Sequence, residues 1–190
     1  SDRLLLSELN KLIEETSKEF DKYNYSKVKS EVDGFFWKIF ADNYLEIVKD
    51  RLYNEKRSKN SKLSAQFTLN ESLLAILKMF APILPFISEE IFQLHFAKKL
   101  KEKSIHVSSF PEFNKKFVNK KSFNIGKEFV TILGEVRKFK AQNQKSLKTP
   151  INLTLEAKYK SLFKDCLQDL SAATNAQKIE FGKEFKIELV

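Results

Sequence analysis

The chain of 190 residues has little cysteine, glycine or proline: one cysteine, four glycines and four prolines. A single cysteine, Cys166, excludes an intramolecular disulfide and a multi-cysteine zinc site. Because Cys166 lies among leucines and a phenylalanine, we expect a buried thiol rather than a nucleophile. The few glycines form no glycine-rich phosphate-binding loop, so the sequence offers no such nucleotide site.

Other features are also missing. No apolar run approaches the roughly 20 residues that span a bilayer, and no signal-peptide pattern opens the chain, so we expect a cytoplasmic protein that contacts no membrane. The two histidines, His95 and His106, have no cysteine or carboxylate at metal-ligand spacing, which predicts no metal site. Glu89 and Glu90 resemble an acid–base pair, but a favourable position at a helix N-terminus explains them better.

What the chain does have is basic charge and aromatic residues. It contains 34 lysines and arginines against 25 acidic residues, a net charge of +9, and 18 phenylalanines. Hydrophobic residues make up 42% of the chain and charged residues 31%, which is typical of a globular domain. The basic surplus favours a polyanionic partner, nucleic acid or an anionic membrane surface. The alternative is that the charges only solvate the surface.

Apolar periodicity predicts five helices. We place them at residues 2–21, 26–54, 64–80, from 88 into the basic run after 97, and 122–144. Ser26 and Ser88 are the expected N-caps of the second and fourth helices. The polar residues 54–64 are expected to connect the second helix to the third.

The last 40 residues have a different pattern. Residues 151–157 alternate between apolar and polar side chains, which predicts a half-buried strand, and a helix follows over 159–175. Two further strands around Gly182 and Lys183 are expected to pair as a hairpin. We therefore expect a helical bundle over residues 1–121, a fifth long helix and basic connection over 122–150, and a small β-α-β-β tail over 151–190 that packs on the bundle.

Four ordered motifs carry a family resemblance. They are DRLLLSELNKLIEE (2–15), GFFWKIFADNYLEIVKDRLY (34–53), MFAPILPFISEEIFQ (79–93) and SIHVSSFPE (104–112). Together they resemble the anticodon-binding domain of the valyl-tRNA synthetases, which belong to class Ia, and the resemblance covers about the first 140 residues. One departure is Asn43, which stands where the family has tryptophan. The isoleucine enzymes usually have an arginine-rich pattern in the second motif, so NYLEIVKDRLY is closer to the valine enzymes.

The resemblance implies a mainly α fold, an antiparallel helical bundle of the class Ia anticodon-binding type. It also implies a monomer that binds the anticodon stem-loop of tRNA(Val). ATP and magnesium would serve the catalytic domain of the same polypeptide, and a separate editing domain would remove threonine. The sequence lacks the HIGH- and KMSKS-type motifs of the class I ATP site, so we expect no cofactor and no catalysis in these residues. A start at the domain-opening motif suggests a fragment of a longer chain.

Two alternatives remain open. One is the same module of the isoleucine enzyme, and the other is a stand-alone helical module that binds RNA or protein.

Candidate RNA contacts are cations and groups able to hold an unstacked base. Arg51 and Arg57 follow the NYLE motif and are predicted to read bases, whereas Arg137 and Lys140 are predicted to bind phosphates. Tyr44 is as well explained by a place in the core. The full set of predicted contacts is Lys38, Asn43, Tyr44, Lys49, Arg51, Arg57, Arg137, Lys138 and Lys140.

Overall fold

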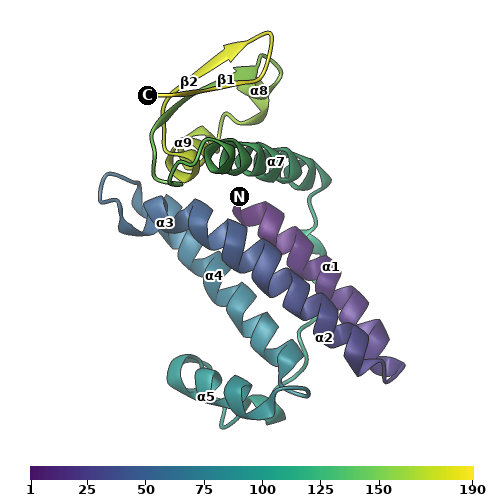
Figure 1. Cartoon of the computed structure of the whole chain (residues 1–190). Coiled ribbons are helices and arrows are strands. Elements are labelled where there is room, and N and C mark those ends of the chain that lie inside the picture. The colour runs from purple at the N-terminus through teal and green to yellow at the C-terminus, as the bar shows by residue number, and fades with distance from the viewer. The chain divides into compact units, whose positions relative to one another are not determined.

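The computed structural model describes the backbone of residues 1–190 and every side chain except those of Lys120 and Lys121. The fold is mainly α with a small C-terminal sheet, as predicted (Figure 1). The chain divides into two compact units. The helical unit comprises residues 2–42 and 63–119; the α/β unit comprises residue 1, residues 43–62 and residues 120–190. The boundaries predicted at residues 121 and 150 stay predictions.

Helices build the helical unit. Its first helix, α1 (Asp2–Asp21), packs against α2 (Tyr25–Gly34), with Val28 and Val32 of α2 fully buried. Hydrogen bonds from α1 also fix the distant segment around the short turn η3 (Lys115–Phe117). Ser7 Oγ donates to the carbonyl of Phe117 at 2.7 Å, and Asn10 Oδ1 accepts from the amide of Asn114 at 2.7 Å. The predicted first helix over 2–21 is confirmed.

The predicted second helix consists of three consecutive segments. After α2 comes η1 (Phe35–Leu45), which is a π-helix, and then α3 (Glu46–Tyr53). The N-cap is Asn24 rather than Ser26, and the Asn24 amide donates to Glu19 Oε2 at 2.9 Å. A π-helix is wider than an α-helix and often occurs at functional sites.

Two other helix starts differ from prediction. Helix α4 (Lys59–Phe80) begins five residues earlier than expected, because Ser58 Oγ accepts the amide of Ser61 in the first turn. Helix α5 (Pro85–His95) begins at Pro85, because proline fits the first turn, where no amide donor is needed. Ser88 is therefore a buried residue within the helix and not its N-cap.

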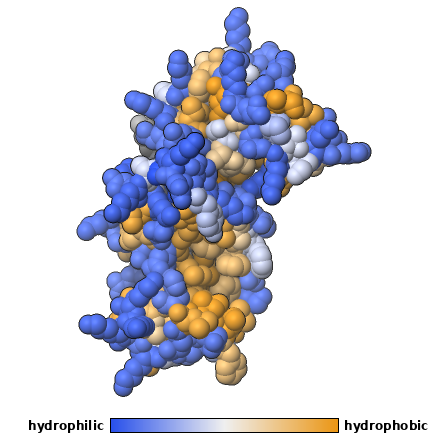
Figure 2. All heavy atoms as spheres, turned by 90° about the vertical axis from the view of Figure 1, so that its left-hand side faces the viewer, coloured by the Kyte–Doolittle hydropathy of each residue, from blue (hydrophilic) through white to orange (hydrophobic). Residues whose placement is uncertain are grey.

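The helical unit also contains α6 (Ala97–Leu100) and the turn η2 (Ile105–Val107). Glu89 of α5 connects to η2, because its Oε2 accepts from Ser104 Oγ and from the Ile105 amide, each at 2.9 Å. The pKa of Glu89 is lowered most by the hydrogen bond from Gln93, and further by those from Ile105 and Ser104. The hydrogen bonds of the Glu89 carboxylate thus give it a structural role, which is to hold η2 against α5. Figure 2 shows hydrophobic side chains exposed on the part of this unit that contains α5.

The α/β unit holds the long helix α7 (Lys120–Gln142), two short helices, α8 (Tyr159–Leu162) and α9 (Leu167–Thr174), and three strands. The strands are β1 (Ile151–Glu156), β2 (Ala176–Gly182) and β3 (Lys186–Leu189), in the order β2-β1-β3. β1 pairs in parallel with β2 and antiparallel with β3. The predicted element order is confirmed, but the predicted helix over 159–175 is interrupted between α8 and α9.

The predicted hairpin is wrong. β2 and β3 lie on opposite edges of β1 and do not pair with each other. β1 takes the central place because it buries Ile151, Leu153 and Leu155, whereas β2 and β3 are largely exposed. A central strand needs the most apolar side chains, and the sequence gives them to β1.

Helices α7 and α9 lie on the same side of this sheet (Figure 1). Their core includes the rings of Phe129, Tyr159 and Phe163, with the Tyr159 and Phe163 rings stacked at 5.0 Å between centroids. Cys166 is buried here, which confirms the sequence prediction, and burial raises the pKa of its thiol to about 11.

Candidate nucleic-acid interface

The two units differ sharply in charge. The α/β unit contains 20 lysines and arginines and 11 acidic residues, whereas the helical unit contains 14 of each. The net charge of +9 therefore lies entirely in the α/β unit. Hydrophilic side chains project from this unit in Figure 2. Because cations that neutralise phosphates supply most non-specific affinity for nucleic acid, the α/β unit is the part of the chain suited to a polyanion.

Arg51 of α3 is buried, with 6% of its surface exposed. Its Nη2 donates to Ser1 Oγ at 2.7 Å, and its Nε lies 3.5 Å from Oδ2 of Asp169 in the first turn of α9. The aspartate also suits the positive end of that helix dipole. Arg51 thus ties α3 to α9.

Arg57 reinforces the same connection from the turn after α3. Its Nη2 donates to Asp169 Oδ1, its Nη1 donates to Gln168 Oε1, and its Nε lies 3.1 Å from Asp50 Oδ2. We name Arg51, Arg57 and Asp169 the arginine clamp. The clamp engages both guanidinium groups within the protein, which favours a structural role for them. Their predicted contact with bases stays a prediction.

Lys140 of α7 is also buried, with 1% of its surface exposed. Its Nζ donates to the carbonyls of Leu147 and Thr174, at 2.8 and 2.7 Å. Burial lowers the pKa of this amine. Thr174 ends α9, where the negative end of the helix dipole stabilises a cation. This arrangement favours a role in holding the protein together over the predicted phosphate contact, which no observation tests.

Arg137 lies one turn before Lys140 and is half-buried. Its Nη1 donates to Asn43 Oδ1 at 3.0 Å, so α7 is joined to the residues that precede α3. Asn43 therefore has a structural partner at the position where the family has tryptophan. Tyr44, beside it, is buried with 3% of its surface exposed, in agreement with a core position.

The remaining predicted contacts are exposed lysines. Lys49 and Lys138 lie in the α/β unit and Lys38 in the helical unit. Lys49 Nζ donates to Glu46 at 2.5 Å on the surface of α3, a pair that water screens strongly. Lys49 and Lys138 are thus the two predicted cations that the α/β unit presents to solvent.

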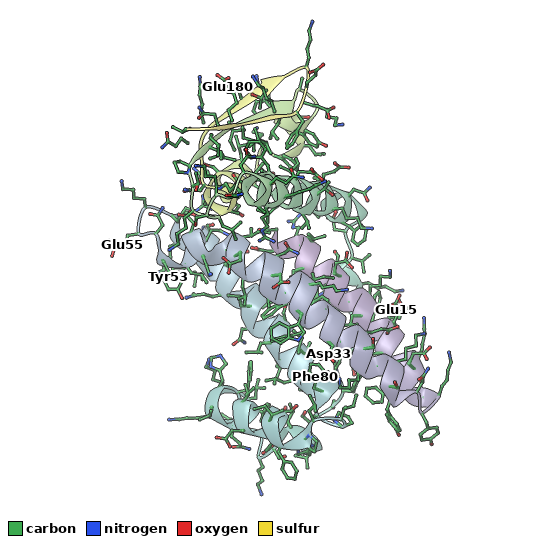
Figure 3. All side chains as sticks on the ribbon, in the orientation of Figure 1. Glu15, Asp33, Tyr53, Glu55, Phe80 and Glu180 are labelled. Carbon is green, nitrogen blue, oxygen red and sulfur yellow. The ribbon has the colours of Figure 1, made fainter. Side chains whose placement is uncertain are left out.

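Tyr53 is not among the contacts predicted from the sequence. This side chain is 81% exposed at the end of α3, next to the turn that carries Glu55 (Figure 3). It lies four residues after Lys49, so the two share a helix face, and exposed Lys56 follows in the turn. An exposed aromatic ring among cations can stack on an unpaired base. The spacing Lys49–Tyr53 was the available signal.

The described side chains contain no group of three or more histidines, cysteines or acidic residues that could hold a metal ion. No helix among the described residues is long and apolar enough to cross a membrane.

Comparison with known proteins supports a single family. Residues 2–157 match the family model of the anticodon-binding domain of tRNA ligase. The valine–tRNA ligase of Wolbachia sp. subsp. Brugia malayi (strain TRS) is 35% identical over 193 residues, covering all of this chain and 22% of that protein. The valine–tRNA ligase of Archaeoglobus fulgidus is 35% identical over 177 residues, covering 93% of this chain and 20% of that protein.

The valine–tRNA ligase of Ehrlichia canis (strain Jake) is 37% identical over 182 residues, covering 95% of this chain and 22% of that protein. The chain thus spans about a fifth of the length of these relatives. On the matching model and these relatives, the chain belongs to the anticodon-binding domain family of tRNA ligases.

Proposed function

We propose that this chain is the tRNA-recognition module of a valine–tRNA ligase. It holds the anticodon stem-loop of tRNA(Val) so that the acceptor end reaches a catalytic domain of the same polypeptide. The relatives cited above are named as valine–tRNA ligases, which supports valine over isoleucine. In this proposal Mg-ATP serves that catalytic domain, an editing domain removes mischarged threonine, and the residues of this chain perform no chemical step.

The confinement of the whole net charge of +9 to one unit is the observation that carries the RNA-binding role. A protein whose lysines only solvate its surface has no reason to keep one unit neutral and the other strongly basic. The α/β unit also presents an exposed aromatic ring, Tyr53, beside Lys49 and Lys56. Phosphate-binding cations with a stacking ring are what a single-stranded loop requires.

A titration of the 190-residue chain with a labelled tRNA(Val) anticodon stem-loop tests this proposal. We expect a dissociation constant of about micromolar order, which rises with salt because binding releases counterions. The matched control is a stem-loop that differs only in its anticodon. Absence of binding at low salt, or binding that salt does not change, would favour a protein-interaction module. We also expect a monomer, which sedimentation of the same sample checks.

A further inference from the structure

Between α7 and β1 lies a segment without acidic residues. Residues 143–149, here named the basic loop, have exposed side chains except for half-buried Thr149, and no aspartate or glutamate occurs from residue 136 to residue 155. Lys145 and Lys148 are exposed on the loop, and among the described residues no ion pair engages either of them. These two ammonium groups are therefore open to an outside anion.

The backbone of the basic loop has a defined shape. At the end of α7 the amide of Lys145 donates to the carbonyl of Lys140 at 2.8 Å, and that of Gln144 donates to Ala141 at 3.0 Å. Gln144 has φ 56°, so these bonds form a Schellman-type helix end. The Thr149 amide donates to Ser146 at 2.9 Å and closes a turn. Local hydrogen bonds therefore shape both ends of the loop.

Two side chains from outside the loop hold its middle. Lys140 Nζ reaches the carbonyl of Leu147 at 2.8 Å, and the Asn175 amide donates to the carbonyl of Lys148. Both anchors also connect to the end of α9: Lys140 of α7 donates to the carbonyl of Thr174, the last residue of α9, and Asn175 directly follows that helix. Burying an ammonium group without a carboxylate costs free energy. The Lys140 ammonium group donates to the carbonyls of Leu147 and Thr174, and through them it fixes this loop against α9.

We propose that the basic loop is a binding site for the phosphodiester backbone of RNA, and that Lys140 and Asn175 are its positioning residues. The inference rests on the proposed function and goes beyond it, because it assigns Lys145 and Lys148 as direct contacts and Lys140 as an indirect one. A loop held in one conformation loses less freedom when it binds, so anchoring strengthens the contact. Backbone contacts carry no base information, so the site serves every anticodon equally.

The test compares variants of the 190-residue chain by RNA anisotropy titration at three salt concentrations, with both stem-loops. The first variant is K145A/K148A. Its matched control is K160A/K164A, which removes the same charge from exposed positions of the same unit at the other end of β1. A strand of six residues is roughly 20 Å long, which is about twice the Debye length at 0.1 M salt.

We expect K145A/K148A to lower affinity about 10-fold or more for both RNAs and to reduce the salt slope by about 1.4 to 1.8, since each lost phosphate contact removes about 0.7 to 0.9. The control should lose about 2-fold or less. Equal losses in the two double variants would overturn the site while leaving the proposed function intact. No salt-dependent binding by the unaltered chain would overturn the proposed function itself.

The positioning role needs a separate measurement. Asn175 has φ 55°, which glycine adopts freely, so N175G removes the anchor without backbone strain. We expect N175G to weaken RNA binding several-fold with an unchanged salt slope, and to cause no further loss in the K145A/K148A background. K140M should do the same if it folds. A loss from N175G that is as large without the two lysines as with them would contradict positioning.

Discussion

The arginine clamp is expected to stabilise the folded chain. Asp169 lies between two guanidinium groups, and the side chains of Arg51, Asp169 and Arg57 are 7%, 8% and 10% exposed. Solvent therefore screens the three charges little. Asp169→Asn keeps the shape of the side chain and removes its charge, so two buried cations lose their shared partner.

Removing one member of a buried ion pair costs about 3 to 5 kcal/mol, because the remaining charge stays buried and uncompensated. Here Arg57 keeps Asp50 and Arg51 keeps Ser1, so the lower end, about 3 kcal/mol, is expected. For a protein of this length that corresponds to a fall in Tm of roughly 6 to 12 °C. Urea unfolding at 25 °C and a thermal scan measure the two quantities.

The matched control is Asp165→Asn, an exposed carboxylate just before α9, where we expect a change within about 0.5 kcal/mol. If the two variants differ by less than that, the clamp contributes nothing and the reasoning fails. Arg51→Ala and Arg57→Ala then separate the two roles. A structural clamp predicts lower stability and equal effects on both stem-loops. Base reading predicts a loss of preference of about 1 to 3 kcal/mol for the valine anticodon.

Three further predictions concern buried groups and catalysis. At pH 8 Cys166 should react with an alkylating reagent about 100-fold more slowly in the folded chain than in urea, because burial raises its pKa from 9.0 to about 11 and only the thiolate reacts; equal rates would contradict burial. The stability of the chain relative to K140M should increase between pH 7 and pH 10, because burial lowers the folded pKa of Lys140 below 10.5 and the unfolded state then binds more protons; a decrease would contradict the burial of a charged amine. The purified chain should show no valine-dependent ATP–pyrophosphate exchange, and measurable exchange would contradict the absence of catalysis.

Local sequence patterns predicted a helix well where a single stripe of apolar residues determines which face is buried. The helix over residues 2–21 follows directly from the spacing of Leu5, Leu9 and Ile13, all buried in the structure. Helix starts were less predictable, because α2 is preceded by Asn24 instead of the expected cap Ser26, and α5 begins at Pro85 instead of after the expected cap Ser88. A cap depends on a single hydrogen bond, whereas a stripe repeats over several turns.

Long-range pairing was not predictable from one sequence. Arg57 and Asp169 are 112 residues apart, and nothing near either residue marks the other as its partner. The same holds for Lys140: the basic neighbourhood that led to its predicted phosphate contact is visible in the sequence, but its carbonyl partner at Thr174 is not. The hairpin failed because strand alternation fixes which face is buried and not which strand becomes central.

The most recognisable motifs and the basic charge lie in different parts of the chain. Three of the four family-like motifs belong to the helical unit, where residues such as Leu9, Phe92 and Ile105 are buried and the net charge is zero. Those motifs specify packing. The net positive charge lies in the α/β unit, which the motif over residues 34–53 enters at Asn43. Motif similarity therefore identifies the fold first, and the residues that make the proposed RNA contacts should be sought in α3, the turn after it and the basic loop, where charge and exposure coincide.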